Sequence, residues 1–167
     1  MRDGRDRTVQ AFWLCILVGV MAATSAATPA PTSVERVEGG LRVQATVSGR
    51  AFAVGIPIPV VLAVRNTGSA AVAITFMNGQ RYDLLARRPR GDEVWRWSHD
   101  RAFIQAVQTM RLGPGEEEAY RITWDQRDFQ GRQVDPGSYE LVAIFMGQVG
   151  ARQGPLTLPP LSITISP

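Results

Sequence analysis

One short span, residues 78–100, gathers side-chain types that serve catalysis and recognition. Ser98, His99 and Asp100 are the three members of a hydrolase triad, written one after another. Successive residues of a strand point to opposite faces, so three adjacent side chains in a strand could not converge as a triad requires. His99 is the only histidine of the chain, so no other partner could complete a serine–histidine mechanism. We therefore expect no catalytic residue here, and we interpret the Arg-Gly-Asp at 90–92 as a turn rather than an adhesion motif.

Metal and cofactor sites are not indicated either. The three glutamates at 116–118 follow a Gly-Pro-Gly turn, and successive side chains diverge along a strand. Asp125, Asp128 and Asp135 share one loop, but their spacing does not match the ligand pattern of a calcium loop. No glycine-rich phosphate loop follows a predicted strand and opens a helix. The sequence thus predicts no enzyme, no metal and no cofactor.

The distribution of charge argues against a nucleic-acid partner. The chain has 18 basic residues, all of them arginine, and 15 acidic ones, for a net charge of +3. Proteins that bind nucleic acids cluster their positive charge into a patch, whereas arginine and acidic residues alternate along this chain. We therefore expect no nucleic-acid partner.

The first 27 residues are typical of a signal peptide. Three arginines precede an apolar run at 11–23, and small residues up to Ala27 offer a cleavage site. The run is shorter than the roughly 20 residues of a membrane-spanning helix. We therefore expect cleavage, no stable membrane insertion and a periplasmic or extracellular location, with an uncleaved anchor as the alternative. Cleavage would remove Cys15, the only cysteine. Residues 28–40 are small, polar and turn-rich, which predicts a flexible leader.

Alternation of apolar and polar residues predicts strands through most of residues 41–167. Asn78-Gly79 is the strongest short hairpin signal. Only residues 98–108 are compatible with a short helical turn, which Ser98 would cap. The predicted strands cover 41–47, 60–66, 72–76, 81–87, 93–98, 118–124, 139–146 and 161–166.

Seven to nine short strands separated by glycine and proline turns predict an immunoglobulin-like antiparallel β-sandwich over 41–167. Tyr139 opens a nearly all-apolar strand, two residues after the Pro136-Gly137 turn. This order is typical of a tyrosine corner, in which the phenol hydroxyl bonds to the backbone of the preceding turn. Trp95, Trp97 and Trp124 could form an exposed stacking platform, but large aromatic residues at strand spacing favour core or cross-strand positions.

Several short motifs, in their order and spacing between Val60 and Phe145, resemble the BsuPI-type intracellular proteinase inhibitor domain. They are Gly79-Gln80 with Tyr82-Asp83, Trp95 to Ser98, Phe103 with Gln105, and Pro136-Gly137 with Tyr139. The resemblance implies an immunoglobulin-like sandwich and the inhibition of serine proteinases. The predicted signal peptide departs from the family's intracellular label, so we expect an exported member.

Two functions of different classes follow from these observations. The first is a single-domain proteinase-inhibitor-like protein that binds a protein partner, such as a serine proteinase, without catalysis. The alternative is a noncatalytic adhesion, assembly or wall-binding module outside the cytoplasm.

Three arginine-containing connections, 87–93, 125–135 and 147–155, could contact a proteinase cleft. Of these connections we favour 87–93, because Pro89 restricts its backbone and so lowers the entropic cost of ordering it on binding. Its candidate contact residues are Arg87, Arg88, Pro89, Arg90, Gly91 and Asp92.

Overall fold

A computed structural model describes residues 30–89, 91–150 and 154–167, so the predicted signal peptide lies outside the described residues. The described residues form twelve strands and no helix, which confirms the predicted all-β class. The strands are β1 (Thr32–Glu38), β2 (Leu41–Val47), β3 (Ala51–Ala53), β4 (Ile58–Asn66), β5 (Val72–Phe76), β6 (Tyr82–Arg87), β7 (Glu93–Arg96), β8 (Gln108–Leu112), β9 (Glu117–Trp124), β10 (Gly137–Phe145), β11 (Leu156–Thr157) and β12 (Leu161–Ser166).

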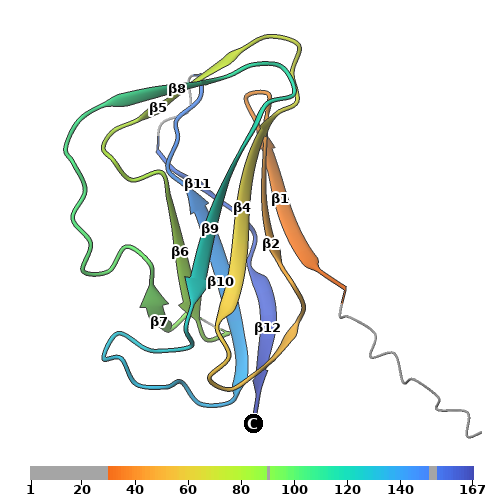
Figure 1. The fold of residues 1–167 in the computed structure, drawn as a ribbon, viewed down its shortest axis with the longest axis vertical. Coiled ribbons are helices and arrows are strands. Elements are labelled where there is room, and N and C mark those ends of the chain that lie inside the picture. Colours follow the sequence, from red (N-terminus) through yellow and green to blue (C-terminus); the bar gives the residue numbers. More distant parts are fainter. Residues whose placement is uncertain (1–29, 90, 151–153) are drawn as a thin grey trace, which may run out of the picture.

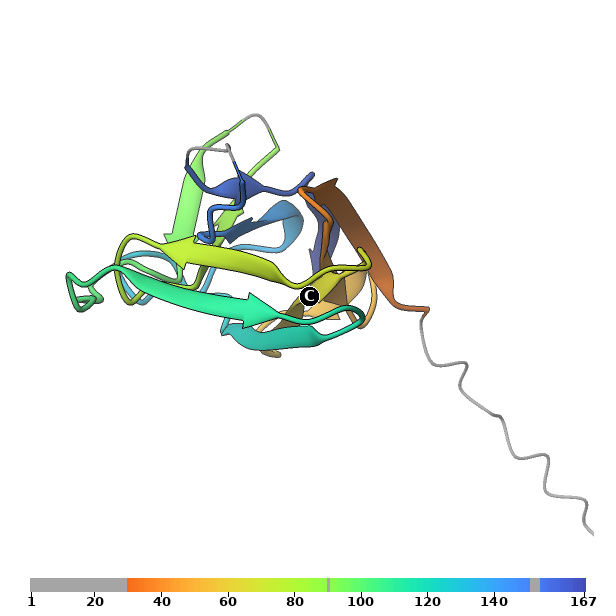
Figure 2. The same cartoon turned by 90° about the horizontal axis from the view of Figure 1, so that it is seen from above.

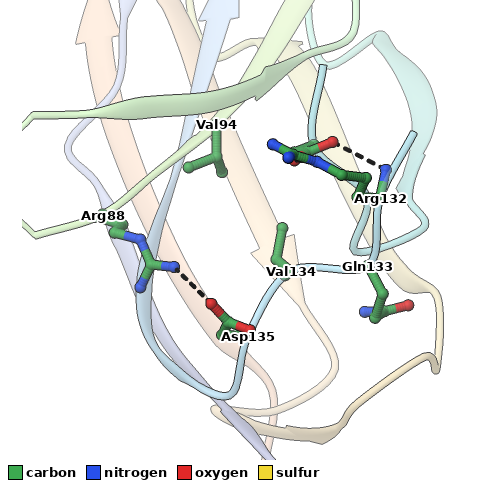
Figure 3. Close-up of a pocket in the computed structure, with 7 residues that line it drawn as sticks. Arg88, Val94, Arg132, Gln133, Val134 and Asp135 are labelled. Atoms are coloured by element: carbon green, nitrogen blue, oxygen red, sulfur yellow. Dashed lines mark hydrogen bonds and ion pairs between the residues drawn. The ribbon is translucent and has the colours of Figure 1, made fainter. Parts of the chain in front are cut away.

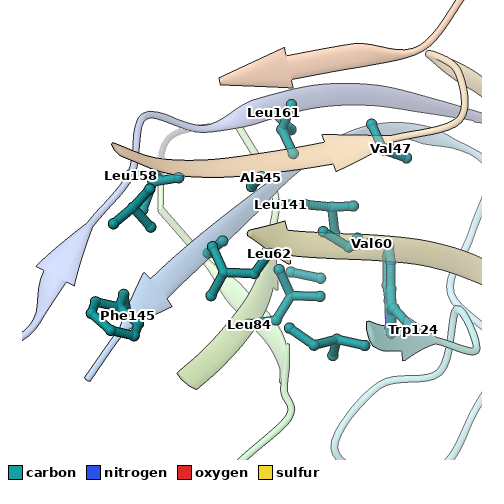
Figure 4. Close-up of a cluster of buried hydrophobic side chains, with 14 of the residues drawn as sticks. Ala45, Val47, Val60, Leu62, Leu84, Trp124, Leu141, Phe145, Leu158 and Leu161 are labelled. Atoms are coloured by element: carbon teal, nitrogen blue, oxygen red, sulfur yellow. The ribbon is translucent and has the colours of Figure 1, made fainter. Parts of the chain in front are cut away.

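Two sheets face each other in a sandwich (Figure 1). One has the order β1-β2-β4-β9, and the other has the order β3-β12-β10-β6-β7, with β11 also paired to β10. All described pairs are antiparallel except β3 with β12. The apolar positions of the alternating strands meet between the sheets, where Val60 and Leu62 lie near Leu84 and Leu141 (Figure 4). The predicted β-sandwich is confirmed, and its immunoglobulin-like character stays a prediction.

The strands β5 and β8 form a third, two-stranded sheet at one end of the sandwich, at the top of Figure 1. We expected Asn78-Gly79 to close a hairpin between the strands on either side of it, and this is wrong. Strand β5 pairs with β8, while β6 pairs with β10 and β7. Asn78 Oδ1 accepts the Gln80 N–H at 2.9 Å, a local turn that carries the chain from one sheet to the other.

The prediction of a flexible leader at 28–40 is also wrong for the described part of that segment. Strand β1 pairs with β2 along its whole length, from Thr32 with Val47 to Glu38 with Leu41. The reversal between the two strands uses Gly39 and Gly40, whose φ angles of 55° and 81° are readily adopted by glycine. Small and polar residues at this sheet edge therefore reflect an exposed strand rather than a free chain.

The tyrosine corner that the sequence predicts is present. The Tyr139 ring is fully buried, and its hydroxyl donates to the Asp135 carbonyl at 2.7 Å. Burial is the main cause that raises the pKa of Tyr139. The hydrogen bond joins β10 to the end of the loop that precedes it.

The segment between β7 and β8 contains no helical turn of the kind we expected at 98–108. The chain makes a turn over 97–100 and then runs without strand or helix from Arg101 to Val107 before β8 begins. In Figure 1 it follows the outer edge of the molecule from β7 up to β8. We call residues 101–107 the apolar segment.

Candidate functional site

The adjacent residues Ser98, His99 and Asp100 do not form a triad. The Ser98 hydroxyl donates to Asp83 Oδ2 at 2.7 Å, whereas His99 Nε2 lies 3.2 Å from Asp100 Oδ2. The His99 ring also contacts the ring of Phe129, with centroids 4.6 Å apart. The serine and the histidine thus have different partners. They diverge because they lie in the turn after β7. Our argument from the alternation of side chains along a strand therefore does not apply to them.

Asp83 is a buried carboxylate that fixes this turn against β6. Only 3 % of its surface is exposed. Its Oδ1 accepts the backbone N–H of Leu84 at 2.9 Å and that of Ser98 at 3.1 Å. Its Oδ2 lies 3.0 Å from Arg96 Nη1 and accepts the Ser98 hydroxyl. These donors satisfy the buried charge of Asp83. The role of Asp83 is therefore to position the chain that leads into the apolar segment.

A continuous row of rings runs from Phe103 of the apolar segment into the domain. The centroid distances are 5.9 Å from Phe103 to Trp97, 4.4 Å from Trp97 to Tyr82 and 5.0 Å from Tyr82 to Tyr120. The Arg101 guanidinium lies over the Trp97 ring, 4.4 Å from its centroid, and its Nε donates to the Trp97 carbonyl at 2.7 Å. Burial raises the pKa of Tyr82, and burial with the nearby Glu118 carboxylate raises that of Tyr120 to about 12.

The apolar segment itself is exposed. Ile104 is 74 % exposed, and Val107 is 64 % exposed. The Ile104 carbonyl accepts the Gly79 N–H at 2.8 Å, and a Cβ on Gly79 would lie 3.4 Å from the Ile104 nitrogen. Sequence reasoning missed this site, although several residues behind the family resemblance, such as Gly79 and Phe103, contribute to its support.

The candidate contact turn at 87–92 is held by charged groups. Arg87 Nε donates to Glu140 Oε2 at 2.8 Å, and the Arg88 N–H donates to the Asp92 carbonyl at 2.8 Å. The Arg88 guanidinium lies 3.8 Å from Asp135 Oδ2 and 5.2 Å from the centre of the Tyr139 ring. The remaining candidate arginine, at position 90, lies outside the described residues.

A pocket of about 370 Å³ opens between this turn and the loop at 125–135. Figure 3 shows Arg88 reaching Asp135, and Arg132 near Val134 on the same loop. Arg132 also pairs with Asp128 at 2.8 Å. The charged groups around this pocket therefore satisfy one another, and its geometry indicates no specific ligand. The third candidate connection, 147–155, is described only in part.

The three tryptophans of the described residues, Trp95, Trp97 and Trp124, form no exposed platform. Trp124 is fully buried, and its Nε1 donates to the Arg127 carbonyl at 3.0 Å. Trp95 and Trp97 are half-buried against the core. The ring of Trp95 lies 6.3 Å from that of Trp124. The expected core or cross-strand placement is confirmed.

Within residues 30–89, 91–150 and 154–167, no group of three or more His, Cys, Asp or Glu side chains is arranged to hold a metal ion. The same ranges contain no helix that is long and apolar enough to cross a membrane.

Comparison with known proteins gives one family match. A family model described as BsuPI, intracellular proteinase inhibitor, matches residues 42–149. No curated protein matches the chain. Among solved structures, the chain is similar to the sporulation control protein Spo0M of Bacillus subtilis, with 16% identity and a TM-score of 0.45 over 78% of this chain and 51% of that one.

A β-glucosidase of Erythrobacter marinus is 18% identical, with a TM-score of 0.42 over 81% of this chain and 16% of that one. The chain thus spans only part of the length of both structures. Likenesses this distant carry no information about activity.

The family description corrects the predicted location. It names an intracellular inhibitor, which contradicts the periplasmic or extracellular location that we expected from residues 1–27. That prediction rested on the arginines, the apolar run and the small residues of positions 1–27, and the structure describes none of these residues.

Proposed function

Because the chain belongs to the BsuPI family of intracellular proteinase inhibitors, we propose that it inhibits a serine proteinase by binding it, without catalysing a reaction itself. The family match carries this proposal, since it spans the sandwich from β2 to the residues after β10. A proteinase inhibitor needs a stable surface that covers the cleft, about 800 Å² per partner in a standard interface.

A rigid sandwich suits this role because little order has to be gained on binding. The core packs β4 of one sheet against β6 and β10 of the other, and the connecting turns are tied to it by hydrogen bonds. Loops held in one conformation lose less entropy in a complex than free ones.

The turn at 87–92 is our proposed basic contact. Pro89 restricts its backbone, and the hydrogen bond between Arg88 and Asp92 closes it. An arginine presented by such a turn would suit a proteinase that selects basic residues through an acidic pocket.

The test is a titration of the chain against a panel of serine proteinases with different primary pockets. We expect stoichiometric loss of activity for at least one of them. The variant carrying Arg87→Ala, Arg88→Ala and Arg90→Ala together should weaken inhibition of a trypsin-like enzyme, with a melting curve as the control for folding. If the intact chain inhibits no member of the panel at micromolar concentration, the proposed function is wrong.

A further inference from the structure

Three exposed apolar side chains gather where the apolar segment meets the end of β5. Met77 is 58 % exposed, beside the 74 % and 64 % of Ile104 and Val107. Phe76 pairs with Gln108, which brings the next residues along each strand, Met77 and Val107, to the same end of the small sheet. Exposed apolar side chains that cluster in this way mark interaction surfaces more often than single ones do.

Ile104 is set apart from its neighbours in the apolar segment by its size and exposure. Ala102 and Ala106, two positions away on each side, are exposed and small. Phe103 is turned toward Trp97 and packs on it. Ile104 is therefore the most exposed large apolar side chain of the segment, followed by Val107.

The segment is held in place from the side that faces the domain. Arg101 and Phe103 both contact Trp97, which stacks on Tyr82 of β6. The Gly79 N–H fixes the Ile104 carbonyl from the other direction. Figure 2 shows the chain between β7 and β8 at the outer edge of the molecule. A segment without regular structure that projects and is already ordered can enter a groove at a low entropic cost.

We propose that the apolar segment occupies the substrate cleft of the inhibited proteinase, with the Ile104 side chain in an apolar pocket of that enzyme. This inference rests on the proposed inhibition of a serine proteinase, but it places the apolar segment in the cleft instead of the turn at 87–92. It names the class of target, an endopeptidase that selects apolar residues. Proteinase clefts bind extended peptide, and an isoleucine side chain that leaves water on binding contributes affinity.

The direction of one carbonyl further defines the mode of binding. The Ile104 carbonyl bonds to Gly79 of its own domain at 2.8 Å. A peptide bond that is to be cleaved must place its carbonyl oxygen among the oxyanion donors of the enzyme. The apolar segment should therefore bind as an uncleaved ligand, and the chain should stay intact in the complex.

The experiment compares Ile104→Asp with Val37→Asp, using the full chain. Val37 lies on β1 and is 56 % exposed, so the same substitution there controls for added charge on an exposed apolar residue. Both variants are titrated against subtilisin and chymotrypsin, which select apolar residues, and against trypsin. Melting curves verify the fold, and intact-mass analysis after long incubation reports cleavage.

We expect the intact chain to inhibit an apolar-selecting enzyme, and Ile104→Asp to raise the inhibition constant at least about 30-fold, as for an interface hot spot. Val37→Asp should change it less than about 3-fold. If the intact chain inhibits an enzyme and the two variants behave alike, the inference is wrong while the proposed function stands. Loss of inhibition only in the triple arginine variant, or cleavage within 101–107, also overturns it. If nothing is inhibited, both proposals fail.

Discussion

The turn at 87–92 and the apolar segment at 101–107 are separated only by β7 and the turn after it, yet the domain holds them by different forces. The turn depends on Arg87 and Arg88, which pair with carboxylates at the surface. The segment depends on ring contacts and on one buried carboxylate, Asp83. Surface ion pairs contribute little to stability, whereas buried contacts are costly to lose. The segment should therefore be the more rigid of the two.

The largest effect is expected from Asp83→Ala. This substitution leaves the N–H groups of Leu84 and Ser98 and the Ser98 hydroxyl without their acceptor, so we expect a loss of about 3 kcal/mol in the free energy of unfolding. Denaturant unfolding measures it.

Asp92→Ala, at an exposed position in the turn, is the matched control and should cost less than about 0.5 kcal/mol. Equal losses for the two aspartates would remove the contrast between buried and surface support.

A smaller loss of stability is expected from a substitution next to the turn at 87–92. Tyr139→Phe keeps the buried ring beneath Arg88 but removes the hydrogen bond to the Asp135 carbonyl. We expect a loss of about 0.5–1.5 kcal/mol, the net contribution of one intramolecular hydrogen bond. Thermal or denaturant unfolding of both proteins gives the difference, and an unchanged stability would contradict the structural role of the corner.

The last effect appears only at high pH and concerns Tyr120, in the row of rings that begins at Phe103. The folded-state pKa of Tyr120 is raised to about 12 from an ordinary value of 10.0, first by burial and then by Glu118. A raised pKa means that the folded protein holds the proton more tightly than the unfolded chain. The resulting stability is complete below pH 10 and is lost as the pH rises toward 12.

Tyr120→Phe should accordingly make the fall in stability between pH 10 and 12 shallower than in the parent chain. Unfolding curves across this range measure the slope. The slope that remains will include Tyr82 and Tyr139, whose pKa values are also raised. Identical slopes for the two proteins would show that Tyr120 is not shielded in the way described.

Local patterns were enough to predict the sandwich and the tyrosine corner. Tyr139 and its Pro-Gly turn lie within a few residues of each other, and alternation in β2 and β12 follows directly from one buried face. The failures occurred where the partner is distant in sequence. We interpreted Asn78-Gly79 as a hairpin turn because nothing in the neighbouring sequence indicates that β5 pairs with the distant β8.

The apolar segment was missed for the same reason. Its support joins Gly79, Tyr82 and Trp97 to Phe103 and to Tyr120 of β9, and only the tertiary fold brings these residues together. Residues 98–108 contain good helix formers, and Ser98 is a suitable cap. Instead, the Ser98 hydroxyl and N–H both donate to Asp83, and the chain follows a path without a helix.

The place of β12 between β3 and β10 has a consequence for how the protein folds. The Ser166 hydroxyl donates to the Phe52 carbonyl across 114 positions of the chain, and β3 has β12 as its strand partner in the described sheet. Closing so long a loop costs entropy before any contact repays it, so we infer slow folding, on the millisecond-to-second scale typical of β-sandwiches. Until β12 docks, one edge of β10 is open along Gly137–Leu141, and an open edge is a template for pairing with another chain. Aggregation during refolding should therefore depend on protein concentration far more than the stability of the finished domain does.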